Sequence, residues 1–206
     1  MKVRSIFFGG IVCVALFHCR ENPVNGSAAI ETDKVPISHR DTVSSTQSLL
    51  DQTGSLLNLE HIQQGFNGLQ IRVWGSARDI PKERLVVLTQ KDMSWSADVY
   101  YITYPHVQEG NLRFDSVAHK KLPDPKSGWP IFSFNLAKLG IRNLPTVMNI
   151  PGYLDDQTTN DYGYHFEIAD TSGYRMYMYT EPQNHKQFDE AIRVTKILDL
   201  IDYELA

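Results

Sequence analysis

Cysteine is nearly absent from this chain. The two cysteines among its 206 residues are Cys13 and Cys19, both close to the N-terminus. Beyond position 19 the chain therefore offers no pair of thiols for an internal disulfide bond and no thiolate ligand for a zinc site. We expect the burial of side chains to stabilise the fold, and roughly 150 residues suffice for one ordinary core.

Clusters of basic residues are also missing. The chain has 20 Lys and Arg against 24 Asp and Glu, which gives a formal net charge of −4 at pH 7. Nucleic-acid binding depends on clustered Lys and Arg that neutralise phosphates. We therefore expect no nucleic-acid partner.

The sequence lacks the short motifs that mark well-known catalytic and cofactor sites. It has no Gly-x-Ser-x-Gly elbow, no phosphate-binding glycine loop and no dinucleotide fingerprint. Its histidines do not form the His-x-x-x-His spacing that places two metal ligands on one face of a helix. We expect neither a cofactor nor a bound metal ion.

The chain does have an informative first segment. Lys2 and Arg4 precede an uncharged, mostly apolar run from Ile6 to Phe17. A short basic start followed by an apolar run is typical of a secretory signal peptide. The run is shorter than the ~20 residues that a membrane-spanning helix needs. The sequence therefore predicts export.

This segment ends in Leu16-Phe17-His18-Cys19, which resembles the lipobox of bacterial lipoproteins. The resemblance implies that residues 1–18 are removed as a signal peptide and that Cys19 carries the lipid that anchors the protein to a membrane. Arg20 differs from the Asp of an inner-membrane retention signal, so the outer membrane of the cell envelope is favoured. The alternative is an ordinary signal peptide followed by an unmodified cysteine.

Residues 19–48 are polar, contain no aromatic side chain and show no sustained periodicity. Such a segment cannot bury enough apolar surface to offset the entropy lost on ordering it, so we expect a flexible tether. Residues 49–206 would then form a single globular domain. Its first element is predicted to be a weakly amphipathic helix over 49–62.

Side chains after this helix alternate as in β-strands. Four strands joined as a meander are predicted at about 69–74, 84–89, 95–104 and 111–122. Strands at 162–168 and 174–180 are predicted to form a second hairpin. Placing Ile168 opposite Tyr174 would make one face of this hairpin wholly apolar.

The same register defines the second face of the hairpin. Glu167 would lie opposite Arg175, and His165 would lie opposite Tyr177. Opposite charges and aromatic side chains are favourable partners across strands. We therefore expect these four side chains to share one face of the sheet.

Two helices complete the predicted fold. A short helix over 131–139 ends near Gly140, and apolar residues recur at helical spacing from Phe188 to Leu205. We predict an α+β fold in which an antiparallel sheet, made of the meander and the C-terminal hairpin, packs with the short middle helix and the amphipathic C-terminal helix. This order of segments is similar to that of lipoproteins of the Bacteroidota.

Aromatic and charged side chains gather on the second face of the predicted strands, and such residues are common at interfaces. The predicted binding face consists of Arg72, Trp74, His165, Glu167, Arg175, Tyr177 and Tyr179. An envelope protein or a glycan would be its partner. The alternative is that both sheet faces are covered, one by the C-terminal helix and the other by residues 49–66 or the 131–139 helix.

Two classes of function stay open. The first, which we favour, is a non-catalytic envelope lipoprotein whose domain binds a partner. The second is a small hydrolase or metal-assisted enzyme that uses His165 and Glu167, with Asp161 as a further candidate. An enzyme usually needs polar groups that converge from several elements. Candidates from distant segments are His106, His119 and Asp98.

Overall fold

The computed structural model describes residues 44–77, 80–105, 112–154 and 162–206. In chain order its elements are α1 (Ser44–Leu56), β1 (Leu69–Ala77), β2 (Ile80–Lys91), β3 (Ser94–Thr103), β4 (Ser116–Lys121), α2 (Trp129–Lys138), η1 (Val147–Asn149), β5 (Tyr162–Asp170), β6 (Gly173–Thr180), η2 (Pro182–Asn184) and α3 (Asp189–Glu204). Among these residues, no helix has the length and apolar character that crossing a membrane requires.

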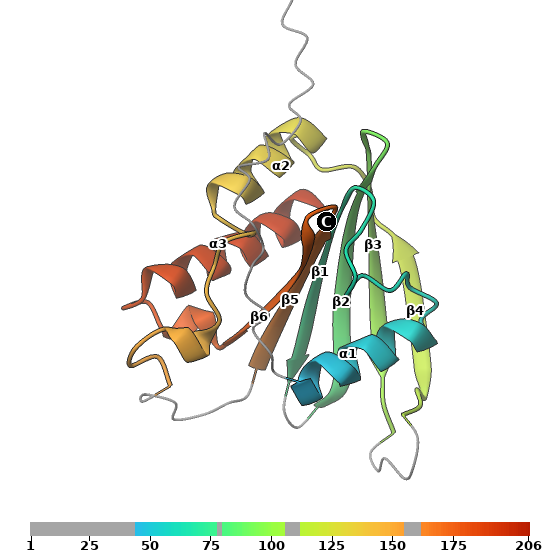
Figure 1. Ribbon diagram of the computed structural model, residues 1–206, viewed down its shortest axis with the longest axis horizontal. Coiled ribbons are helices and arrows are strands. Elements are labelled where there is room, and N and C mark those ends of the chain that lie inside the picture. Colours follow the sequence, from blue (N-terminus) through green and yellow to red (C-terminus); the bar gives the residue numbers. More distant parts are fainter. Residues whose placement is uncertain (1–43, 78–79, 106–111, 155–161) are drawn as a thin grey trace, which may run out of the picture.

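The six strands form one antiparallel sheet in the order β4-β3-β2-β1-β5-β6 (Figure 1). β1 to β4 make a meander, and β5 and β6 make a hairpin that joins the sheet through β1. β1 therefore lies in the middle, paired with β2 on one side and with β5 on the other. The predicted α+β fold, with its meander, hairpin, middle helix and C-terminal helix, is confirmed.

One face of the sheet, here called the α3 face, is covered by α2, α3 and residues 141–153 (Figure 1). Ile71 of β1 and Phe166 of β5 belong to the same buried cluster as Val194 and Ile197 of α3. These side chains recur every second residue on the strands and every third or fourth residue on the helix. The α3 face therefore holds the larger hydrophobic core.

The opposite face, here called the α1 face, is covered by α1 and the chain that follows it. Leu50 of α1 packs in a buried cluster with Trp74 of β1. Ile62 and Phe66 form a second cluster, and the Phe66 N–H donates to the Asp170 carbonyl oxygen at 3.0 Å. The sheet is therefore the middle of three layers, and both of its faces are buried along most of the central strand β1.

Gly65 allows the chain after α1 to approach the sheet closely. Its φ is +102°, and a Cβ atom at this position would lie only 2.9 Å from the Asp170 carbonyl oxygen. Both the backbone angle and the space favour glycine over any other residue.

α1 begins earlier than the sequence predicts. Residues 44–48, assigned to the 19–48 tether, are helical, and the helix ends at Leu56 instead of 62. Leu50, Thr53 and Gly54 are buried at i, i+3 and i+4, so contact with the sheet stabilises a helix whose sequence is largely polar. The predicted signal peptide (1–18) and the rest of the tether lie outside the described residues.

The register of the β5–β6 hairpin differs from the predicted register by one residue. The observed partners are Ala169–Tyr174, Ile168–Arg175, Glu167–Met176, Phe166–Tyr177 and His165–Met178. The predicted pairs Ile168–Tyr174, Glu167–Arg175 and His165–Tyr177 are therefore wrong.

The turn between β5 and β6 explains this register. Asp170 Oδ1 accepts a hydrogen bond from the Ser172 N–H at 2.7 Å, which holds a tight turn that places Asp170 opposite Gly173. Gly173 has a φ of +145°, which favours glycine. Because both sheet faces are buried, either register gives apolar partners, and turn geometry decides between them.

Phe166 offers a test of the α3-face core. Its side chain is fully buried and stacks on Tyr177 with ring centroids 4.9 Å apart. Phe166→Ala should lower the free energy of unfolding by about 3–5 kcal/mol because it leaves a cavity. Phe134→Ala, at a position that is 61% exposed on α2, should change it by less than about 0.5 kcal/mol. Urea denaturation measures both, and equal effects would contradict this assignment of the core.

Candidate functional site

The side chains predicted to form a recognition face are mostly buried. Their exposed fractions are 1% for Arg72, 0% for Trp74, 0% for Glu167, 1% for Tyr177 and 0% for Tyr179, with His165 and Arg175 partly buried. The prediction that they form one exposed face is therefore wrong. The structure agrees instead with the alternative in which both sheet faces are covered.

Three of these residues belong to the α3 face, where they hold the chain after α2 beside β6. Arg175 Nη1 donates to the Arg142 carbonyl oxygen at 2.7 Å. The hydroxyls of Tyr177 and Tyr179 donate to backbone carbonyl oxygens at 2.7 Å, those of Ile141 and Pro145 respectively. These polar groups satisfy backbone acceptors of their own chain, which is a structural role.

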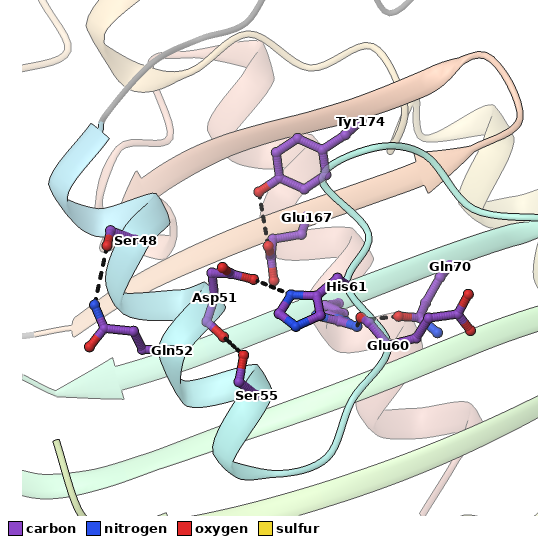
Figure 2. A network of polar contacts seen from close by, with 10 residues as sticks. Ser48, Asp51, Gln52, Ser55, Glu60, His61, Gln70, Glu167 and Tyr174 are labelled. Carbon is purple, nitrogen blue, oxygen red and sulfur yellow. Dashed lines mark hydrogen bonds and ion pairs between the residues drawn. The ribbon is translucent and has the colours of Figure 1, made fainter.

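The other four residues belong to the α1 face, where Glu167 is the centre of a buried polar cluster. Glu167 Oε2 accepts from Trp74 Nε1 at 2.7 Å. Its Oε1 accepts from the Tyr174 hydroxyl at 2.9 Å, a bond that Figure 2 shows. Both carboxylate oxygens thus have donors from neighbouring strands. Such hydrogen bonds compensate for the loss of water around a buried charge.

Arg72 lies opposite Glu167 on the neighbouring strand β1. Arg72 Nε donates to Gln70 Oε1 at 2.8 Å, and its Nη2 donates to the Glu60 carbonyl oxygen. Burial lowers the pKa of Arg72, and the charge of Glu167 opposes that shift. We call Gln70, Arg72, Trp74, Glu167 and Tyr174 the Glu167 cluster.

Tyr174 was not among the predicted site residues, although it is a principal donor to Glu167. Burial and the adjacent Glu167 raise the pKa of Tyr174 strongly, so its hydroxyl keeps its proton and remains a donor. A usable signal was present in the sequence. A glutamate between Phe166 and Ile168 on a strand buried on both faces requires a polar partner on a neighbouring strand.

His165 shares the α1 face with Glu167 but does not complete an acid–base pair. Burial lowers the pKa of His165 from 6.5 to about 4, so the imidazole is neutral at pH 7. Its Nδ1 is buried and has no hydrogen-bond partner among the residues that the structure describes. Glu167 meanwhile uses both oxygens for Trp74 and Tyr174, and neither oxygen serves as a partner of the imidazole.

The distant candidates do not converge on His165. His119 Nε2 and Asp98 Oδ1 are 2.9 Å apart, but they lie on β4 and β3, and strands β2 and β1 separate them from β5. His106 and Asp161 lie outside the described residues. Within the described ranges, no group of three or more His, Cys, Asp or Glu could hold a metal ion.

A small cavity opens on the α3 face between the sheet and α3. Its volume is about 110 Å³, and its polar lining includes Arg84, Asp202, Tyr162 and Tyr164. Arg84 Nη1 and Asp202 Oδ1 form an ion pair at 2.7 Å. Pockets for drug-sized ligands usually hold at least about 300 Å³, so this cavity suits a few water molecules.

Comparison with protein-family models, curated proteins and solved structures gave no match for this chain.

The Glu167 cluster predicts a marked loss of stability when its charge is removed. Glu167→Gln removes the buried negative charge that lies opposite Arg72. It also places an amide NH2 group, which is a donor, against either the Trp74 N–H or the Tyr174 hydroxyl, which are donors themselves. We expect the free energy of unfolding to fall by about 3 kcal/mol. Asp202→Asn, which breaks an exposed ion pair, should lower it by no more than about 1 kcal/mol. Similar losses in urea denaturation would contradict a central role for Glu167.

The lowered pKa of His165 predicts a pH dependence of stability. Because the folded state binds the proton less readily than the unfolded state, stability should fall as pH drops from about 6.5 to about 4. The total loss is at most about 3 kcal/mol, as 1.36 kcal/mol corresponds to one pKa unit. His165→Gln should remove this part of the pH dependence in urea denaturation at pH 7 and pH 5. An unchanged difference between the two pH values would contradict it.

Proposed function

We propose that this chain is a lipid-anchored protein of the bacterial cell envelope whose α+β domain binds a partner without catalysing a reaction. The observation that carries the anchor is the lipobox-like Leu16–Cys19 after a basic and apolar start. These residues lie outside the described ranges, so the anchor rests on sequence. The outer membrane is the favoured location because Arg20 follows Cys19.

The buried polar cluster supports binding over catalysis. A general base must come within hydrogen-bond reach of a substrate proton. Glu167 is fully buried, and its two oxygens already accept hydrogen bonds from Trp74 and Tyr174. The Glu167 carboxylate, which the enzyme alternative would use for catalysis, therefore stabilises the fold.

The histidine on the same strand face supports this preference. His165 has a pKa of about 4, which makes it a weak proton acceptor near neutral pH. Asp98 on β3 lies three strands away from β5, and His119 on β4 lies four strands away. Among the residues that the structure describes, no second histidine or carboxylate of the candidate set therefore converges on His165.

The distance between anchor and domain is compatible with binding away from the membrane surface. In sequence, 24 residues separate Cys19 from Ser44, the first residue of α1. A fully extended chain of that length reaches roughly 80 Å at ~3.3 Å per residue. A lipid on Cys19 would therefore leave the domain free to meet partners within the envelope.

Acylation of Cys19 is the direct test of this proposal. Cells fed labelled palmitate should incorporate it into the wild-type chain, and mass spectrometry should find a mature N-terminal peptide that begins at acylated Cys19. Cys19→Ala should abolish the label. Cys13→Ala is the matched control and should keep the label, because Cys13 lies in the segment that is removed. A labelled Cys19→Ala chain or a different mature N-terminus would reject the lipid anchor.

A further inference from the structure

The two edges of the sheet differ in how they are protected. At the β6 edge, Arg175, Tyr177 and Tyr179 bind the backbone of residues 141–145. At the opposite edge lies β4, the outermost strand in Figure 1, and all six of its residues are exposed. Even Val117, its one large apolar side chain, is 41% exposed.

β4 is held by its neighbour β3 and not by burial in a core. Its backbone pairs with β3 from Ser116 to Lys121. His119 stacks on Tyr100 of β3 with ring centroids 4.4 Å apart and pairs with Asp98. In the described part of the chain, no other strand pairs with β4. Its outer side therefore presents unpaired backbone donors and acceptors.

The pairing pattern identifies these outward groups. The Leu122 N–H donates to the Ala97 carbonyl oxygen across the β3–β4 pair. Because inward and outward groups alternate along an antiparallel strand, the N–H groups of Val117, His119 and Lys121 point away from β3. An extended segment laid along β4 would meet three donors at the spacing of a β-ladder.

The charge of this edge indicates the chemistry of its occupant. Lys120 and Lys121 lie on opposite faces of β4, because successive strand residues alternate. Among the described residues, neither lysine forms an ion pair with a carboxylate. β4 itself thus carries two lysines and no acidic residue, although the whole chain has a net charge of −4. Asp98, which lies opposite Lys121 on β3, pairs with His119 instead. Carboxylates of an added strand could pair with a lysine on either face.

We propose that β4 binds an extended acidic segment of a partner protein by strand addition, an inference that rests on the proposed function as a binding domain. Strand addition supplies affinity through main-chain hydrogen bonds and specificity through alternate side chains. Lysines on an edge strand disfavour pairing with a second copy of the same basic edge. The same charges favour an acidic segment, which makes the edge selective.

The test uses the mature chain in detergent and two capped ten-residue peptides, one alternating Val with Glu and one alternating Val with Lys. Fluorescence anisotropy should show at least about ten-fold tighter binding of the acidic peptide. Residue-resolved hydrogen exchange should show that this peptide protects the N–H groups of Val117, His119 and Lys121. Absence of binding by the acidic peptide, or binding without this protection, would overturn strand addition.

Two variants separate backbone pairing from general attraction. Val117→Pro removes one outward N–H that the fold does not use, so it should weaken binding about ten-fold and shift the melting temperature by only a few degrees. Lys120→Glu/Lys121→Glu should weaken acidic binding about ten-fold and favour the basic peptide. Lys138→Glu/Lys186→Glu makes the same charge change away from β4 and should have little effect. Equal effects of the two charge variants would show nonspecific attraction and reject the proposal.

Self-association and anchoring are checked separately. Sedimentation should show that the wild-type chain forms no dimer through β4. A dimer through β4 would be recognised because Val117→Pro dissociates it. Such a dimer would mean that β4 pairs with a second copy, which contradicts an acidic partner. Acylation of Cys19 is measured without the peptides. An acylated chain whose β4 edge binds no acidic peptide would reject strand addition and leave the lipid anchor intact.

Discussion

The fold depends on one buried carboxylate. Glu167 of β5 accepts hydrogen bonds from Trp74 of β1 and Tyr174 of β6, so a single side chain links three adjacent strands. Arg72 lies across from it and also donates to the Glu60 carbonyl oxygen. A buried charge of this kind is stable only while its partners stay in place. The position of the chain that covers the α1 face is therefore coupled to the pairing of the central strands.

The sequence predicts the elements of the fold better than their mutual contacts. Alternation and helical periodicity identified all six strands and the two later helices. In α3, for example, burial reinforces the period, whereas all six residues of β4 are exposed. The β5–β6 register could not be predicted in the same way. Both faces of the hairpin are buried, so apolar matching does not discriminate between neighbouring registers. The hydrogen bond from the Ser172 N–H to Asp170 selects the observed register. The helix α1 likewise depends on a contact with the sheet that periodicity alone did not show.

For the candidate site, the sequence indicated side chains that do interact but not whether they are exposed. Most of the side chains assigned to a binding face do make contacts with one another or with nearby backbone, but they lie inside the molecule. Tyr177 and Tyr179 point to the α3 face, whereas Trp74 and Glu167 point to the α1 face. The predicted binding face required these polar and aromatic side chains to be exposed, whereas the alternative had both sheet faces covered. In a sheet covered on both faces, such side chains instead supply the hydrogen bonds that buried polar groups require.

The central position of β1 has a consequence for the order in which the chain folds. β1 pairs with β2, its neighbour in sequence, but also with β5, so that Leu69 lies opposite Asp170. The meander can form from local contacts alone, whereas β1–β5 pairing must close a loop of about a hundred residues, which is entropically slow. During synthesis one side of β1 therefore stays unpaired until β5 has left the ribosome. In that interval the strand edge most prone to misassembly belongs to β1, although β1 lies in the middle of the finished sheet.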